Sequence, residues 1–234
     1  MFPLKDDVPS RSTPFVTLGL IGLNVLVFLY QVSLQLTGDG RAARVAEAFV
    51  LEFGAVPCRL SGACASPDSF PHPLLTVVTA MFLHGGLLHV GGNMLYLWIF
   101  GDNVEDTLGH GRFLLFYLLS GAAAAAAQTA AGPASPVPMI GASGAVSGVL
   151  GAYLILFPRA TILTLVTFVF FIRLVHVPAM VVLGFWIVVQ LFNGLGSFHT
   201  PGGEGGVAWF AHIGGFLAGI GLLLIVRPRR TARL

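Results

Sequence analysis

Long apolar stretches constrain this chain more than any other feature of its sequence. The first, Phe15 to Leu36, has 22 residues and no charge, which suits a membrane-spanning helix and exceeds the apolar core of a cleaved signal peptide. Five more apolar stretches occupy 84–101, 113–131, 143–157, 178–193 and 207–226. Only 9% of the residues are charged, against about 25% in soluble domains. The sequence therefore predicts an all-α, polytopic membrane bundle of six transmembrane helices.

A seventh apolar segment, 160–176, is predicted not to span. It contains Arg173 and His176 and follows Pro158 and Arg159, so we expect an interfacial or partly re-entrant segment. With six spans and a cytoplasmic N-terminus, nine of the twelve Lys and Arg residues fall on the cytoplasmic side, as the positive-inside rule favours. A seventh span would move the four arginines near the C-terminus outside.

The predicted organisation has three parts. A cytoplasmic segment, 1–14, precedes a six-helix membrane domain, 15–226, and a basic cytoplasmic tail, 227–234, follows it. Both termini are thus expected in the cytoplasm. Because the small, scattered net charge of +2 does not indicate nucleic-acid binding, we expect the membrane bundle itself to carry the function.

The connection 37–83 is long enough to have structure of its own, and the six-span count places it on the external side. It contains both cysteines of the chain, Cys58 and Cys64. They are compatible with a small disulfide loop in an oxidising compartment, and equally with two free thiols. We therefore expect a structured external loop between the first two helices.

Polar side chains inside the predicted spans carry the functional signal, because each is costly in hydrocarbon. The second span opens with His84, His89 and Asn93, the fourth opens with Ser143, and His212 lies early in the sixth. His89 and Asn93 are four residues apart and share a helix face. Counting 1.5 Å per residue in a core about 30 Å thick puts Ser143 and His212 both roughly 8 Å below the outer surface. The two side chains are therefore expected at one depth.

Glycines at helical spacing flank these two side chains. Gly144, Gly148 and Gly151 lie on one side of the fourth span, and Gly215 and Gly219 share the face of His212. Small residues at such spacing let helix backbones approach closely in lipid. Packing alone would explain any single pair, but here both stripes accompany a reactive side chain, so we expect the two helices to meet.

A serine beside a neutral imidazole is the minimum for covalent acyl transfer, because the imidazole takes the hydroxyl proton and later returns it to the leaving amine. An orienting carboxylate is not evident, since Glu204, in an external loop, is the one acid after Asp106. The sequence thus predicts a Ser-His dyad. The backbone N–H of Ser143 at a helix N-terminus, together with His89 and Asn93, can supply donors to an oxyanion.

The motifs H-x4-H-x3-N, G-x-S-G and A-H-x-G-G, in this order on the second, fourth and sixth spans, resemble the rhomboid protease family. The resemblance covers nearly the whole chain. It implies that Ser143 is the nucleophile, that His212 is the base, and that His89 and Asn93 are oxyanion donors. It also implies that His84 supports the external loop.

Further positions follow from the same resemblance. Gly141, Gly144 and Gly215 are expected to support the site, and Glu105 resembles a structural glutamate at the inner end of the second span. No cofactor and no metal are expected.

The fifth span contributes two more candidates. Trp186 and Gln190 resemble residues lining the side where substrate enters, although a lipid-facing aromatic and a satisfied amide remain equally open. Ser147 departs from the pattern, because some bacterial members place an aromatic ring there to stack on the base.

The function implied is that of an intramembrane serine endopeptidase that cleaves transmembrane segments of other membrane proteins, single-pass or polytopic. We expect a multi-pass protein of a bacterial cytoplasmic membrane, in contact with the lipid bilayer. Its site is expected to open outward, and the sequence is compatible with a monomer. Substrates with weak helix formers near the cut are favoured.

Three alternatives remain. A catalytically silent relative that binds membrane proteins usually lacks the serine or the histidine. A zinc site of His84, His89 and His212 would leave Asn93 and Ser143 unexplained, and no His-Glu-x-x-His motif occurs. A transporter would need polar groups along a path across the membrane. The remaining histidines have no assigned role: His72, His110, His176 and His199.

Overall fold

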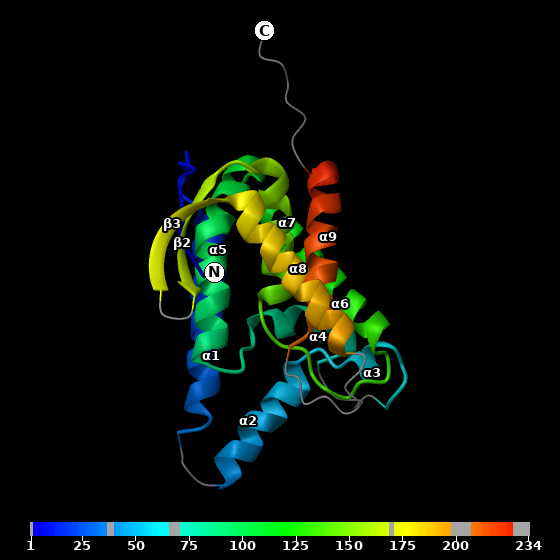
Figure 1. Ribbon diagram of the computed structural model, residues 1–234. Helices are drawn as coiled ribbons and strands as arrows, with labels where there is room; N and C mark the ends of the chain where they lie inside the picture. Colours follow the sequence, from blue (N-terminus) through cyan, green and yellow to red (C-terminus); the bar gives the residue numbers. More distant parts are fainter. Residues whose placement is uncertain (1, 37–39, 66–70, 169–170, 198–206, 227–234) are drawn as a thin grey trace.

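The computed structural model describes residues 2–36, 40–65, 71–168, 171–197 and 207–226 and is mostly helical (Figure 1). The predicted tail 227–234 and the loop residues His199 and Glu204 lie outside the described residues. Six helices match the six predicted apolar stretches. They are α1 (Phe15–Ser33), α5 (Leu87–Leu108), α6 (His110–Ala131), α7 (Ser143–Leu156), α8 (Ala179–Ser197) and α9 (Trp209–Val226).

The lengths and hydropathies of these helices indicate an integral membrane protein. α1, α6, α8 and α9 are each long and apolar enough to cross a membrane, and α5 qualifies together with the helical turns before it, from which it is bent by 84°. α7 has 14 residues, about 21 Å at 1.5 Å per residue and thus shorter than a core of about 30 Å. The described residues therefore contain four to five candidate spans, and the count of six stays a prediction.

A three-stranded antiparallel sheet lies beside the helices and was not expected from the sequence. β1 (Phe2–Asp6) pairs with β2 (Thr161–Phe168), which pairs with β3 (Phe171–Pro178). The described residues of the segment 160–176 therefore form two paired antiparallel strands, where an interfacial or partly re-entrant segment was expected. Its β-branched residues favour strands, but hydropathy alone does not separate a short apolar strand from an apolar helix.

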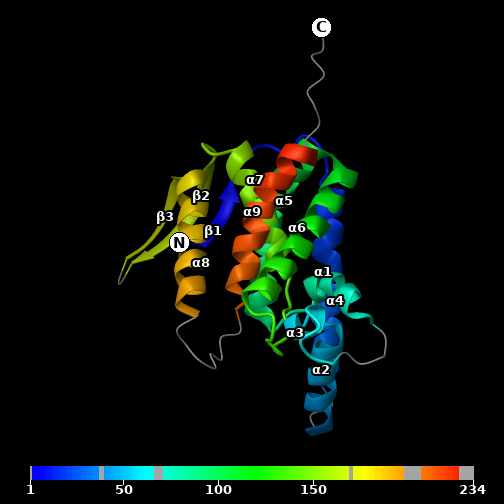
Figure 2. The same cartoon turned by 90° about the vertical axis from the view of Figure 1, so that its right-hand side faces the viewer.

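The residues before β2 and after β3 lie side by side at one end of the bundle. The N–H of Ala179 donates to the carbonyl of Ala160 at 2.8 Å, and the N–H of Met180 donates to that of Pro158 at 3.1 Å. α8 therefore begins where α7 ends, and α9 runs parallel to α7 (Figure 1). β1 contacts α5, and β2 and β3 contact α8, so the sheet lies at one side of the bundle, away from α6 (Figure 2).

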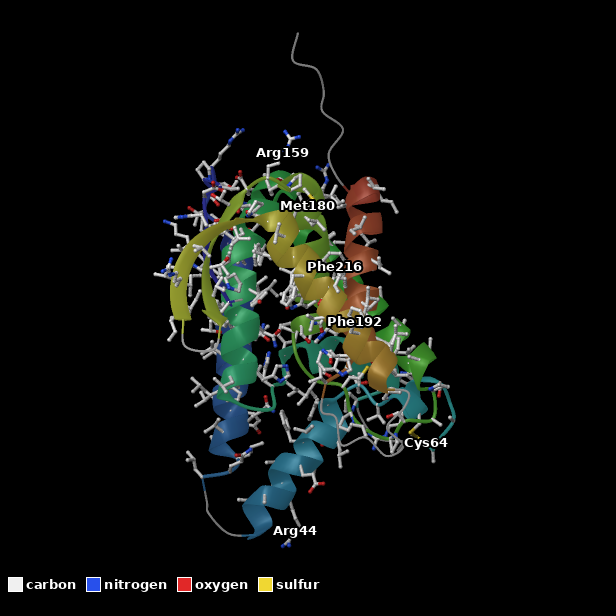
Figure 3. The ribbon with its side chains drawn as sticks, in the orientation of Figure 1. Arg44, Cys64, Arg159, Met180, Phe192 and Phe216 are labelled. Carbon is white, nitrogen blue, oxygen red and sulfur yellow. A yellow bond between two sulfur atoms is a disulfide. The ribbon has the colours of Figure 1, made fainter. Side chains whose placement is uncertain are left out.

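The connection between α1 and α5 is structured, as predicted. It contains α2 (Gly40–Phe53), α3 (Pro57–Leu60), α4 (Pro73–Thr79) and the short 3-10 helix η1 (Ala80–Phe82). Cys58 and Cys64 form a disulfide. Figure 3 shows Cys64 and Arg44 at the end of the molecule opposite Arg159.

α7 and α9 cross in backbone contact, which confirms the close approach predicted from the glycine stripes. A Cβ on Gly215 would meet the carbonyl oxygen of Gly144, and a Cβ on Gly219 would meet that of Gly148. In lipid such contacts give helix pairs their van der Waals packing. The crossing therefore holds the first turns of both helices together.

At the opposite end of the bundle, Glu105 joins α5 to α1. Its fully buried carboxylate accepts hydrogen bonds from the N–H groups of Val16 at 2.9 Å and Thr17 at 2.7 Å, and from the Thr17 hydroxyl at 2.6 Å. His110 Nδ1 lies 2.6 Å from the same carboxylate. The free N–H groups at the start of α1 thus find their acceptor on another helix.

Candidate active site

Ser143 and His212 meet at the first turns of two parallel helices. Ser143 is the first residue of α7, and His212 is the fourth residue of α9. The distance between Ser143 Oγ and His212 Nε2 is 2.8 Å, within hydrogen-bonding range. The equal depth counted from the sequence therefore corresponds to direct contact between these two side chains.

Gly141 brings the preceding loop against α5. Its φ is 118°, a value that residues with a Cβ rarely adopt. Its N–H donates to the carbonyl of Ala80 at 2.8 Å, and a Cβ at this position would lie 2.6 Å from His89 Nε2. Glycine is thus required here both by the backbone conformation and by the proximity of the imidazole.

Two side-chain donors of α5 face this loop. His89 Nδ1 accepts a hydrogen bond from the N–H of Gly85 at 3.2 Å, so in the neutral ring the proton is on Nε2, the nitrogen beside Gly141. Asn93 Nδ2 is buried and has no hydrogen-bond partner among the described residues. Because buried donors are normally paired, this amide is suited to an oxygen atom bound in the site.

His84 lies beneath the residues that precede the serine. The N–H of Ala142 faces His84 Nε2 at 3.5 Å. The backbone of His84 is held on both sides by Gln31 of α1, whose Oε1 accepts from the N–H at 2.9 Å and whose Nε2 donates to the carbonyl at 3.3 Å. Sequence reasoning missed Gln31, although a glutamine inside the first apolar run was a visible signal.

Trp186 and Gln190, expected to line the substrate side, both contact His212. Gln190 Oε1 lies 2.8 Å from His212 Nδ1, and the ring centroids of Trp186 and His212 are 5.9 Å apart. Ser147, at the position of the missing aromatic, donates its hydroxyl to the carbonyl of Ser143 at 2.6 Å. Rings beside His212 therefore come from Trp186 of α8 and from Trp209 of α9, whose centroid is 6.2 Å away.

The connection before α5 also anchors the loop that leads to Ser143. Ala55 and Met139 form an antiparallel bridge, the N–H of Cys58 donates to the carbonyl of Ser135 at 3.0 Å, and the Ser61 hydroxyl donates to the carbonyl of Pro133 at 2.7 Å. No motif in the sequence pointed to these long-range backbone contacts.

A cavity of about 1190 Å³ opens onto the site. It is bounded by α5, α6, α7, α8, α9 and the loop before Ser143, and its lining includes Ser143, His212, Asn93, Tyr96 and Trp186. This exceeds the roughly 300–1,000 Å³ of small-molecule pockets, so the space suits a polypeptide segment. Within the part of the chain that the structure describes, no three His, Cys, Asp or Glu side chains come together as metal ligands.

Comparisons with known proteins identify relatives of this chain. The sequence model of the Rhomboid domain family matches residues 71–229. The chain is 46% identical over 78 residues to the rhomboid protease GluP of Bacillus subtilis, an overlap of 33% of this chain and 15% of that protein. It is 32% identical over 150 residues to the mitochondrial rhomboid protein 1 of Saccharomyces cerevisiae, covering 62% of this chain and 40% of the relative.

A plant protein gives a similar overlap. RHOMBOID-like protein 1 of Arabidopsis thaliana is 32% identical over 160 residues, which cover 68% of this chain and 36% of the relative. The chain thus spans well under half the length of these curated relatives.

Proposed function

The chain belongs to the rhomboid family, and from this premise we propose that it is an intramembrane serine endopeptidase with Ser143 as nucleophile and His212 as base. The observation that carries the proposal is the 2.8 Å contact between Ser143 Oγ and His212 Nε2 at the first turns of α7 and α9. A hydroxyl beside a neutral imidazole is the arrangement that activates serine for acyl transfer.

The proposed reaction has two halves. His212 Nε2 takes the hydroxyl proton as Ser143 Oγ bonds to the scissile carbonyl carbon, and the same proton then passes to the leaving amine as the C–N bond breaks. Water attacks the resulting acyl-enzyme in the second half, with His212 again taking a proton and returning it to Ser143.

Three donors are proposed for the oxyanion. They are the N–H of Ser143, His89 Nε2–H and the amide of Asn93. Support comes from the unpartnered Asn93 Nδ2 and from the acceptor role of His89 Nδ1. Removing one such donor typically costs about 10²- to 10³-fold in rate.

The proposed substrates are transmembrane segments of other membrane proteins, because the cavity is bounded by apolar helices and is large enough for a peptide. A helix must open locally before its carbonyl can be attacked, so segments with Gly, Ala or other weak helix formers near the cut are favoured.

The proposed topology has six spans in a bacterial cytoplasmic membrane, with both termini in the cytoplasm and the site opening outward. Support comes from the disulfide Cys58–Cys64, which suits an oxidising compartment, and from Arg159 at the opposite end of the molecule. A reporter fused after Leu234, or labelling of cysteines introduced at Leu165 and Thr231, tests it. An external C-terminus would overturn the six-span count.

Cleavage by purified protein in liposomes tests the activity. A panel of single-span substrates is incubated with the wild type, with Ser143→Ala and with His212→Ala. We expect cleavage by the wild type alone, and both variants should keep the wild-type thermal unfolding profile. Substantial cleavage by either folded variant would refute the dyad, whereas loss of activity to a chelator would favour the zinc alternative. Substrate binding without cleavage by the wild type would favour the catalytically silent alternative.

A further inference from the structure

Gln190 of α8 is a buried amide in contact with His212, and a Ser-His pair alone gives it no role. Its side chain is 6% exposed, and both ends of its amide are engaged. Oε1 lies 2.8 Å from His212 Nδ1, and Nε2 donates to the carbonyl of Trp186 at 3.3 Å. The amide is therefore a fixed partner of the imidazole on the side away from Ser143.

The two contacts determine which nitrogen of His212 carries the proton. A backbone carbonyl can only accept, so the NH₂ group of Gln190 must face Trp186 and the amide oxygen must face the imidazole. An oxygen acceptor requires a proton on His212 Nδ1. Nε2 is then unprotonated and can accept the hydroxyl proton of Ser143, which is what a general base requires.

We infer that Gln190 is the positioning residue of the site, which holds His212 in the tautomer and ring orientation that Ser143 needs. This inference rests on the proposed function and deepens it, because the site then contains a Ser-His-Gln triad. In this triad a neutral amide, which orients the imidazole and takes no proton, replaces the usual carboxylate. The Nδ1–H···O contact also persists when His212 becomes an imidazolium, so it stabilises the positive charge that develops there.

α8 supplies a second restraint from the same face. Trp186 precedes Gln190 by one helical turn, so both side chains point the same way. The Trp186 and His212 rings are tilted by 38° at 5.9 Å, and Phe216 of α9 stacks on Trp186. The imidazole is thus held at its edge by an amide and on its face by an indole, both from one helix.

The test measures Ser143 reactivity without a substrate. A fluorophosphonate probe is reacted with the full-length protein in detergent, and the second-order labelling rate is compared among the wild type, Gln190→Leu and Gln190→Glu. The leucine variant removes the acceptor, and we expect labelling to slow by about 10- to 100-fold, which is a part of the roughly 10²- to 10⁴-fold that general-base catalysis contributes as a whole. The glutamate variant keeps an oxygen acceptor and should recover most of the rate.

A matched control variant and separate measurement of kcat and KM distinguish a positioning role of Gln190 from a structural one. Val188→Ala changes an exposed residue of the same helix and should label like the wild type. With a cleavable substrate, Gln190→Leu should lower kcat and leave KM within about threefold, because the lost contact acts on the base and not on binding. If the leucine variant does not fold, Gln190→Asn is used in its place. Its amide oxygen is farther from the imidazole by about one C–C bond, so the labelling rate should fall at least about tenfold.

Failure of the inference differs from failure of the proposed function. Suppose that the wild type is labelled at Ser143 and that folded Gln190→Leu or Gln190→Asn is labelled at the same rate. This result would overturn the positioning role of Gln190 alone. Equal impairment of the leucine and glutamate variants would also overturn it. Labelling that does not depend on Ser143 at all, as judged with Ser143→Ala, would instead overturn the serine mechanism.

Discussion

Replacing Gly141 by alanine is expected to remove most of the proteolytic activity and leave the helical bundle in place. The new Cβ would lie 2.6 Å from His89 Nε2, whereas ordinary contacts begin at 3.4 Å, so the loop and the imidazole must separate by the difference, 0.8 Å. A displacement of about 1 Å in a catalytic group costs about 10²-fold, and loss of an oxyanion donor costs about 10²- to 10³-fold. We therefore expect the cleavage rate to fall 100- to 1,000-fold by this estimate.

The same substitution also affects stability, by a separate route. A residue with a Cβ at a φ of 118° carries backbone strain of about 1–3 kcal/mol. The assay therefore needs two readouts, the initial rate of cleavage of a single-span substrate in liposomes and the thermal unfolding midpoint in detergent. Activity is expressed per folded molecule, so that strain is not mistaken for lost catalysis.

Gly91→Ala is the matched control. Gly91 is an exposed residue of α5, and a Cβ there would meet nothing within 4 Å. Alanine is a better helix former than glycine by about 1 kcal/mol, so this variant should be fully active and no less stable. If folded Gly141→Ala instead cleaves within about threefold of the wild-type rate, the placement of Gly141 against His89 and the donor role of His89 are both refuted.

Three further outcomes are expected. Asn93→Ala should lower kcat by about 10²- to 10³-fold with little change in KM, as measured with a cleavable substrate. Glu105→Ala should lower the free energy of unfolding by at least about 2 kcal/mol, because the amides at the start of α1 lose their buried acceptor, and thermal unfolding measures this. Burial raises the pKa of Asp6, whose carboxylate accepts from the Tyr153 hydroxyl. The folded protein therefore binds the proton of Asp6 more tightly than the unfolded chain does. The stability that this gives is fully present below the ordinary aspartate pKa of 3.8 and is lost as the pH rises through the raised pKa of the folded state. Asp6→Asn should accordingly raise the unfolding midpoint near neutral pH and leave it unchanged in acid, and unfolding at both pH values checks this.

The helices were predictable because the apolar runs carry few charges and, except for the short run that forms α7, are long enough to span a bilayer, where only satisfied backbone is stable. The sheet was not predictable in the same way. The sequence of β1 contains Lys5 and Asp6 and resembles a polar loop, and no pattern within it indicates which strand it pairs with. Its partner strand lies more than 150 residues further along the chain, and that pairing depends on where α7 and α8 place β2 and β3.

The contact between Ser143 and His212 was predictable because both lie at one depth, in the first turns of their helices, and because glycine stripes let the two helices approach closely. The role of Gln190 was not. Whether a glutamine on α8 faces lipid, a passing substrate or the imidazole depends on the rotation of that helix about its own axis, which a single sequence leaves open. The same holds for Trp186, whose ring lies next to that of His212.

The pairing of β1 with β2 also imposes an order on biosynthesis. β1 is synthesised before α1, α5, α6 and α7, yet Asp6 pairs with Ile162, which emerges only after these helices. Until then the strand has no edge to join, and its N–H and C=O groups must stay with water. Closure of the sheet is therefore a late folding event, and it can take place only when the helices synthesised in between have brought the two strands to the same end of the bundle.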